Sequence, residues 1–210
     1  MKIKNVIASF LLAIPAVGFA NAPMEKSVEC LKASAMPKDM DTWKQVDFDR
    51  LFPQLDTGVI PDGPLDGTVV YSDEPTVIDQ IDNELQKRFL LWFGPRVWQG
   101  KKFYADEGIL WNRVIGLERF PAYVYEGKSV FDPDGAPSIM INYADGDQID
   151  GYKKIDEIFT KAKLNVLDEI REVRPGFYLG RSNIKNQFAL NFTLYDAALD
   201  VERIHPSECE

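Results

Sequence analysis

Residues 187–195, Gln-Phe-Ala-Leu-Asn-Phe-Thr-Leu-Tyr, decide the fold because their side chains alternate in character with a period of two. Two different faces result from this alternation: Phe188, Leu190, Phe192 and Leu194 on one, and Ala189, Asn191, Thr193 and Tyr195 on the other. A period of two is typical of a β-strand that presents one face to an apolar core. We therefore take this stretch as the last strand of a sheet.

Seven further segments before this strand have a similar composition, and turn sequences rich in Gly, Pro, Asp and Asn separate many of them. The eight predicted strands cover residues 68–71, 97–103, 109–116, 122–130, 137–143, 165–173, 177–183 and 187–195. Closely spaced antiparallel strands best remove their exposed edges by closing into a barrel. We predict a mainly β protein with accessory helices (α+β), built on an antiparallel, lipocalin-like barrel of about eight strands. A curved open sheet wrapped around a helix is the alternative.

The longest predicted helix covers residues 74–93 and packs against the sheet. Asp73 can cap it, Pro75 suits its first turn, and Gly94 with Pro95 should end it. Its apolar side chains form one stripe: Val77, Ile78, Ile81, Leu85, Phe89 and Trp92.

Shorter helices are predicted over residues 41–52, with Asp41 as N-cap, and over residues 152–161. Residues 53–67 are dense in Pro, Gly and Asp, which predicts a turn-rich segment.

The N-terminus has the pattern of a secretory signal peptide. A short positively charged start precedes an apolar run over residues 6–19, which is too short to span a bilayer comfortably. We expect cleavage between Ala20 and Asn21, because a later cut would leave Pro23 beside the scissile bond. The alternative is an uncleaved membrane anchor. The sequence therefore predicts a periplasmic or secreted protein.

The predicted organisation is a signal peptide at 1–20, an N-terminal lead-in at 21–47, a single barrel-like domain at 48–200 and a C-terminal tail at 201–210. About 190 residues remain after cleavage, which suits one domain of ordinary size. The apolar content of 45% is sufficient for a substantial core.

The chain is acidic, and removal of Lys2 and Lys4 changes its formal charge from −9 to −11. A field of this sign repels nucleic acid and anionic membrane surfaces. Two isolated lysine pairs, Lys101-Lys102 and Lys153-Lys154, are expected to be solvated. We expect no nucleic-acid partner and no stable membrane insertion after signal cleavage.

The two cysteines, Cys30 and Cys209, lie near opposite ends of the mature chain. In an oxidising compartment this pattern predicts one disulfide between them; two free thiols are the alternative. The single histidine, His205, lies in the C-terminal tail, which disfavours histidine-based catalysis. No metal site and no cofactor is expected.

Several short motifs occur in a fixed order: IPDG at 60–63 with DGT at 66–68, WQGKKF at 98–103, NR at 112–113, YEGKS at 125–129, DEIREV at 168–173 and PGFYLG at 175–180. This order resembles a poorly characterised group of bacterial proteins with IPDG…GT, WxGKxF and DEIRxVxPGxYLG elements. More loosely, it is similar to the GXWXG-type, lipocalin-like families. The resemblance covers about residues 48–195 and supports a fold more than an activity.

Carboxylates and arginines are the remaining candidates for chemistry. In the strand at 165–173, Asp168 or Glu169 could face the barrel interior. Arg113 or Arg171, placed inward and paired with one of these carboxylates, could bind a ligand carboxylate bidentately. A salt bridge that ties strands together is the alternative reading of the same residues.

Aromatic side chains are the second resource of a small-molecule site, because such sites are mostly apolar with a few polar anchors. The candidate ligand contacts are Trp98, Trp111, Tyr125 and Tyr178. Simple core filling is the alternative role of these rings.

Three functions remain open. The first is an exported protein that binds a small apolar or amphipathic ligand inside the barrel. The second is an enzyme, an isomerase or lyase of a lipid or terpenoid-like compound, with Asp168 or Glu169 as general base. The third is a structural or envelope-interaction protein without a cavity.

Overall fold

The structure is a computed structural model that describes residues 27–132 and 134–201. The predicted signal peptide, His205 and Cys209 lie outside the described residues. Export, its cleavage site and the disulfide between Cys30 and Cys209 therefore stay predictions.

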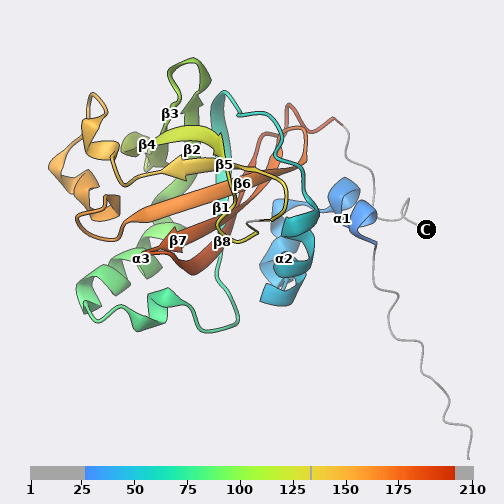
Figure 1. The fold of residues 1–210 in the computed structure, drawn as a ribbon, viewed down its shortest axis with the longest axis horizontal. Helices are drawn as coiled ribbons and strands as arrows, with labels where there is room; N and C mark the ends of the chain where they lie inside the picture. The colour runs from blue at the N-terminus through green and yellow to red at the C-terminus, as the bar shows by residue number, and fades with distance from the viewer. Residues whose placement is uncertain (1–26, 133, 202–210) are drawn as a thin grey trace, which may run out of the picture.

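Eight antiparallel strands close into a barrel in which each strand pairs with its neighbours in sequence and the last pairs with the first (Figure 1). The strands are β1 (Gly63–Val70), β2 (Trp98–Tyr104), β3 (Ile109–Val114), β4 (Leu117–Gly127), β5 (Ser138–Asn142), β6 (Val166–Arg174), β7 (Phe177–Ile184) and β8 (Gln187–Tyr195). This topology confirms the predicted fold class. The alternative of an open sheet is wrong, because β8 pairs with β1 over residues 191–195.

Strand β1 begins five residues earlier than predicted, inside the segment expected to form turns. Glycines in β1 and β2 allow the two strands to approach each other closely. A Cβ atom at Gly67 would lie 2.5 Å from the ring of Trp98, and one at Gly100 would lie 2.1 Å from the carbonyl oxygen of Leu65. Glycine in a strand can therefore mark a close backbone approach rather than a turn.

The predicted helix at 74–93 is two elements, the 3₁₀ helix η3 (Val77–Gln80) and the helix α3 (Glu84–Val97). Asp73 does not cap it, because its carboxylate accepts a hydrogen bond from the backbone N–H of Gln45 at 2.8 Å. Thr76 and Asp79 instead close a separate capping box around η3. The side chain of Asn83 then accepts from the N–H of Gln86 at the start of α3.

The apolar stripe predicted for this helix is also divided. Val77 and Ile78 are buried, whereas Leu85 and Trp92 are 79% and 47% exposed. Helix α3 contributes Leu90 to the core instead. The predicted end at residues 94–95 is wrong, since the helix continues to Val97. No helix of the described chain is both long enough and apolar enough to cross a bilayer.

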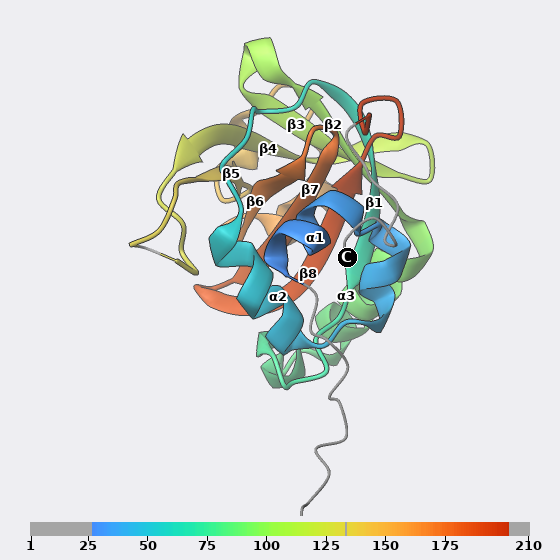
Figure 2. The same cartoon turned by 90° about the vertical axis from the view of Figure 1, so that its right-hand side faces the viewer.

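An N-terminal helical shell covers the outer face of β6, β7 and β8 (Figure 2). It consists of α1 (Val28–Ser34), η1 (Pro37–Thr42), α2 (Gln45–Leu51) and η2 (Phe52–Gln54). Lys44 rather than Asp41 is the N-cap of α2, so the helix predicted over 41–52 is shorter and interrupted. Every residue of β7 is buried because the strand meets the barrel interior on one face and this shell on the other.

The remaining short helices lie in the loops between strands. They are η4 (Ala105–Glu107), η5 (Gly146–Gln148) and η6 (Lys154–Phe159). The helix predicted over 152–161 is thus a shorter 3₁₀ element. Phe159 of η6 packs on Tyr143 with ring centroids 5.5 Å apart, which brings the loop between β5 and β6 into the barrel core.

Candidate functional site

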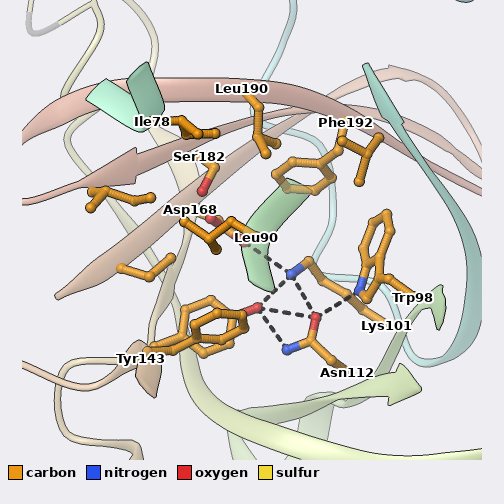
Figure 3. Close-up of a pocket in the computed structure, with 14 residues that line it drawn as sticks. Ile78, Leu90, Trp98, Lys101, Asn112, Tyr143, Asp168, Ser182, Leu190 and Phe192 are labelled. Carbon is orange, nitrogen blue, oxygen red and sulfur yellow. Dashed lines mark hydrogen bonds and ion pairs between the residues drawn. The ribbon is translucent and has the colours of Figure 1, made fainter. Parts of the chain in front are cut away.

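The barrel interior is mostly filled, but a cavity of about 70 Å³ remains inside it (Figure 3). Its apolar lining consists of Val69, Ile78, Leu90, Trp98, Phe159, Val166, Ile184, Leu190 and Phe192. Its polar lining consists of Lys101, Asn112, Tyr143, Asp168 and Ser182. Ile78 comes from η3 and Leu90 from α3, so the segment between β1 and β2 forms part of the cavity wall.

Lys101 of β2 is the centre of the polar group. Its side-chain nitrogen donates to Asp168 Oδ2 at 2.9 Å, to Tyr143 Oη at 2.5 Å and to Asn112 Oδ1 at 3.2 Å. A lysine ammonium has three N–H donors, so all of them are used inside the barrel. The lysine itself is 2% exposed.

Aromatic rings surround the same nitrogen. It lies 5.5 Å from the ring centroid of Trp98 and 5.1 Å from those of Tyr143 and Phe192. Contacts of this kind stabilise a cation where water is excluded. Trp98 also donates its indole N–H to Asn112 Oδ1 at 2.8 Å. The amide nitrogen of Asn112 donates to the carbonyl of Phe120 and to Tyr143 Oη.

The alternation of side chains along β2 explains why one of two neighbouring lysines points into the barrel and the other points outward. Lys101 shares the inward face with Phe103, whereas Lys102 faces outward and pairs with Glu118 at 2.8 Å. The prediction that both lysines of this pair are solvated is therefore wrong for Lys101. Lys153 and Lys154 are exposed, as predicted.

Burial changes the titration of this group. Desolvation lowers the pKa of Lys101, and the neighbouring Asp168 carboxylate opposes that effect. Desolvation raises the pKa of Tyr143 well above its ordinary value of 10.0, and the charge of Asp168 adds to this. Tyr143 is thus held as the neutral phenol. Within residues 27–132 and 134–201, no three His, Cys, Asp or Glu side chains gather in a way that could hold a metal ion.

Of the two predicted carboxylates, the structure brings only Asp168 into the cavity. Its partner is Lys101, not the arginine that the sequence suggested. Glu169 faces the outside of the barrel, where its Oε1 accepts from the backbone N–H groups of Val130 and Phe131. The two residues separate because successive side chains of a strand point to opposite faces.

Neither predicted arginine reaches the cavity. Arg113 is opposite in phase to Asn112 and forms an outer ion pair with Asp66 at 2.7 Å. Arg171 is fully buried, but between the barrel and the N-terminal shell. It donates to Ser138 Oγ, Asp132 Oδ2 and the carbonyl oxygens of Phe52 and Ala136. The expectation of an inward arginine is wrong, because the shell creates a second buried environment outside the barrel.

The four aromatic residues predicted to contact a ligand lie in different places in the structure. Trp98 lines the cavity, and its contact with a ligand stays a prediction. Trp111 lies on the outer side of β3 in a groove with Tyr104 and Tyr123, and Tyr125 is 44% exposed. Tyr178 belongs to the interior core but does not line the cavity, and its hydroxyl donates to the carbonyl of Val59 at 2.9 Å.

The sequence reasoning missed Lys101, Asn112 and Tyr143 as site residues. One signal could have identified the first two. In the motif at 98–103, Lys101 has the phase of Phe103, and in the next strand Asn112 has the phase of Leu110. A polar residue in phase with the apolar face of a strand is a candidate for the interior.

Comparisons with known proteins leave the resemblance described above as a prediction. No family model matches the chain, and no curated protein sequence matches it. A solved structure, a protein from Thermomonospora curvata, is similar to this chain with 16% sequence identity and a TM-score of 0.44. The similarity covers 73% of this chain and 87% of that one.

Proposed function

We propose that this protein is an exported binding protein that holds a small, largely apolar molecule in the barrel cavity, with one polar group of the ligand at the Lys101–Asp168 pair. The observation that carries the proposal is a buried charge pair in the wall of an otherwise apolar cavity. Apolar pockets with a few convergent polar groups are typical of small-molecule sites.

The energetics of the pair support a functional role. Both side chains are less than a tenth exposed, at 3% and 7%. Transfer of two charges from water into a protein interior costs several kcal/mol per ion, and their attraction seldom gives a net gain over apolar residues of similar volume. A barrel selected for stability alone would gain from an apolar pair at these two positions. Retention of the charges is consistent with recognition of a ligand.

The cavity volume limits the ligand. About 70 Å³ is far below the 300–1,000 Å³, in round figures, of ordinary ligand pockets. The occupant is therefore a molecule of a few heavy atoms, or a larger one that enters when the wall formed by Ile78 and Leu90 moves outward. Export is part of the proposal because of the sequence pattern of residues 1–20.

Native mass spectrometry of protein purified from its own compartment tests the proposal. We expect a copurifying small molecule that is released on denaturation. A second assay titrates benzene, a small apolar probe, and follows the assigned indole N–H resonance of Trp98 by NMR. Absence of any released molecule, together with no benzene-dependent shift at Trp98, would overturn the proposal.

A cavity-filling variant supplies the matched control for both assays. Val166 lines the cavity, whereas Val46 is 64% exposed on α2. Val166→Phe should abolish the benzene-dependent shift, and Val46→Phe should leave it unchanged.

The enzymatic alternative has one specific observation in its favour. Asp168 is a carboxylate in the cavity wall with one oxygen free, and Glu169 is excluded from that cavity. An isomerase or lyase on this scaffold would therefore use Asp168 as its base.

A further inference from the structure

One carboxylate oxygen in the cavity group has no hydrogen-bond partner. Asp168 is 5% exposed, and its Oδ2 accepts from Lys101. Its Oδ1 is buried and accepts from no group of the described chain. Buried polar atoms are almost always hydrogen-bonded, and an unsatisfied one that is charged is especially costly. Because Asp168 lines the cavity, an occupant of that cavity can supply the missing donor.

Most hydrogen-bond donors of the cavity lining are, in contrast, already used. The three N–H groups of Lys101 go to Asp168, Tyr143 and Asn112. Both N–H groups of the Asn112 amide and the indole N–H of Trp98 also have acceptors. A ligand carboxylate would find few donors here and would lie beside the negative charge of Asp168. The unpaired oxygen of Asp168 therefore favours a ligand group that donates a hydrogen bond over one that only accepts.

The charge of the ligand follows from the pairing. The ammonium of Lys101 balances the carboxylate of Asp168 at 2.9 Å, so the group as a whole offers no net negative charge to a cation. A second ammonium would be repelled by Lys101 at short range. Ser182 lies opposite Asp168 on β7 and also lines the cavity. A neutral hydroxyl group can donate to Asp168 and bond to the Ser182 hydroxyl at the same time.

We infer that the ligand is a neutral alcohol with a small apolar body, whose hydroxyl group donates to Oδ1 of Asp168. The inference rests on the proposed binding function and specifies the chemical class of the ligand. It reverses the expectation from sequence that a ligand carboxylate is bound by an arginine.

Four small probes of similar size test the inference on the wild-type protein. They are butan-1-ol, its isomer 1-methoxypropane, butanoate and butylammonium. Each is titrated while the indole N–H resonance of Trp98 is followed by NMR, because that group lies in the cavity wall and donates to Asn112. We expect butan-1-ol to bind about tenfold more tightly than the ether, because only the alcohol can donate a hydrogen bond to the charged acceptor. The two ionic probes should bind more weakly than the ether.

Equal affinity for the alcohol and the ether would overturn the inference and leave the proposed function standing, since the cavity would then recognise only the apolar body. Tightest binding of butanoate or butylammonium would also overturn it. If neither benzene nor any of the four probes binds, and native mass spectrometry finds no copurifying molecule, the proposed function falls together with the inference.

A matched pair of variants assigns the effect to one oxygen. Asp168→Asn should reduce the preference for the alcohol over the ether to less than threefold. Glu169→Gln, the same change at the next residue but on the outer face, should retain the preference. If Asp168→Asn does not fold, the comparison of alcohol and ether on the wild-type protein still decides the question.

Discussion

Lys101 and Asp168 come from β2 and β6, which lie across the barrel from one another, and their side-chain atoms meet at 2.9 Å in its interior. The two residues are 67 positions apart in the chain. Their contact therefore depends on closure of the whole barrel. It also makes the pair sensitive to loss of either partner.

Replacement of Lys101 should be strongly destabilising. In Lys101→Met the carboxylate of Asp168 loses its ion-pair partner while it remains buried, which costs about 3–5 kcal/mol in comparable buried pairs. Urea denaturation should show this loss in the free energy of unfolding. Lys102→Met is the control, because that neighbouring side chain faces outward, and its midpoint should stay near that of the wild type. Similar midpoints for the two variants would contradict the assignment of Lys101 to a buried pair.

Removal of both charges should restore stability. In Lys101→Met/Asp168→Leu no buried charge remains unpaired, so the double variant should be at least about 2 kcal/mol more stable than Lys101→Met. The same denaturation experiment measures this difference. The double variant should still bind benzene but should lose the preference for butan-1-ol over 1-methoxypropane. A double variant no more stable than the single one would mean that Lys101 stabilises the barrel by packing rather than by charge.

Tyr143 should remain un-ionised in the folded protein at alkaline pH. Its pKa is raised in the folded state, so its contribution to stability is present below about pH 10 and is lost as pH rises through the folded-state pKa. The phenolate absorbance of the folded protein near pH 10 should therefore contain no contribution from Tyr143. Tyr143→Phe should leave the folded-state phenolate amplitude unchanged. A reduced amplitude in Tyr143→Phe would contradict its burial as a phenol.

Arg171 should be needed to hold the N-terminal shell on the barrel. Its guanidinium bonds to Ser138 and to the carbonyl oxygen of Phe52, and it stacks 4.9 Å from the Phe52 ring. A lysine lacks the planar fork, so Arg171→Lys should lower the free energy of unfolding by about 2–4 kcal/mol. Arg113→Lys is the control at an outer ion pair and should change it little. Thermal unfolding of both variants measures the two changes in the free energy of unfolding.

The predicted disulfide is tested by mass spectrometry of the denatured protein. Alkylation before reduction should modify neither Cys30 nor Cys209, and alkylation after reduction should modify both. Two alkylated thiols in the unreduced protein would exclude the disulfide. Cys30 lies on α1, so this bond would fasten the shell to the C-terminal tail.

The period of two in residues 187–195 correctly predicted β8, and the spacing of the strands correctly predicted the barrel. These features were predictable because they depend on local alternation and on the need to satisfy strand edges. The segment at 63–67 was not, because Gly67 reflects a close contact with Trp98 on the neighbouring strand. From the sequence alone, a glycine in a turn cannot be distinguished from a glycine at such a close contact.

The site was predicted only in part because the sequence does not reveal a second buried environment. Asp168 and Trp98 were correctly suspected of lining the interior. Arg171 and Glu169 are charged residues of the kind expected inside the barrel, yet both are buried outside it: Arg171 against Phe52 of the N-terminal shell, and Glu169 against the backbone of Val130 and Phe131. The pairing of Lys101 with Asp168 joins distant strands, so no local pattern predicts it.

The pairing of β8 with β1 has a consequence for synthesis of the protein. Residues 66–70 find their partners in residues 191–195, which are synthesised long after β1. Until then, β1 and β7 would each present an open edge that can pair with other chains. A nascent chain that is kept extended until β8 has been synthesised would avoid that hazard.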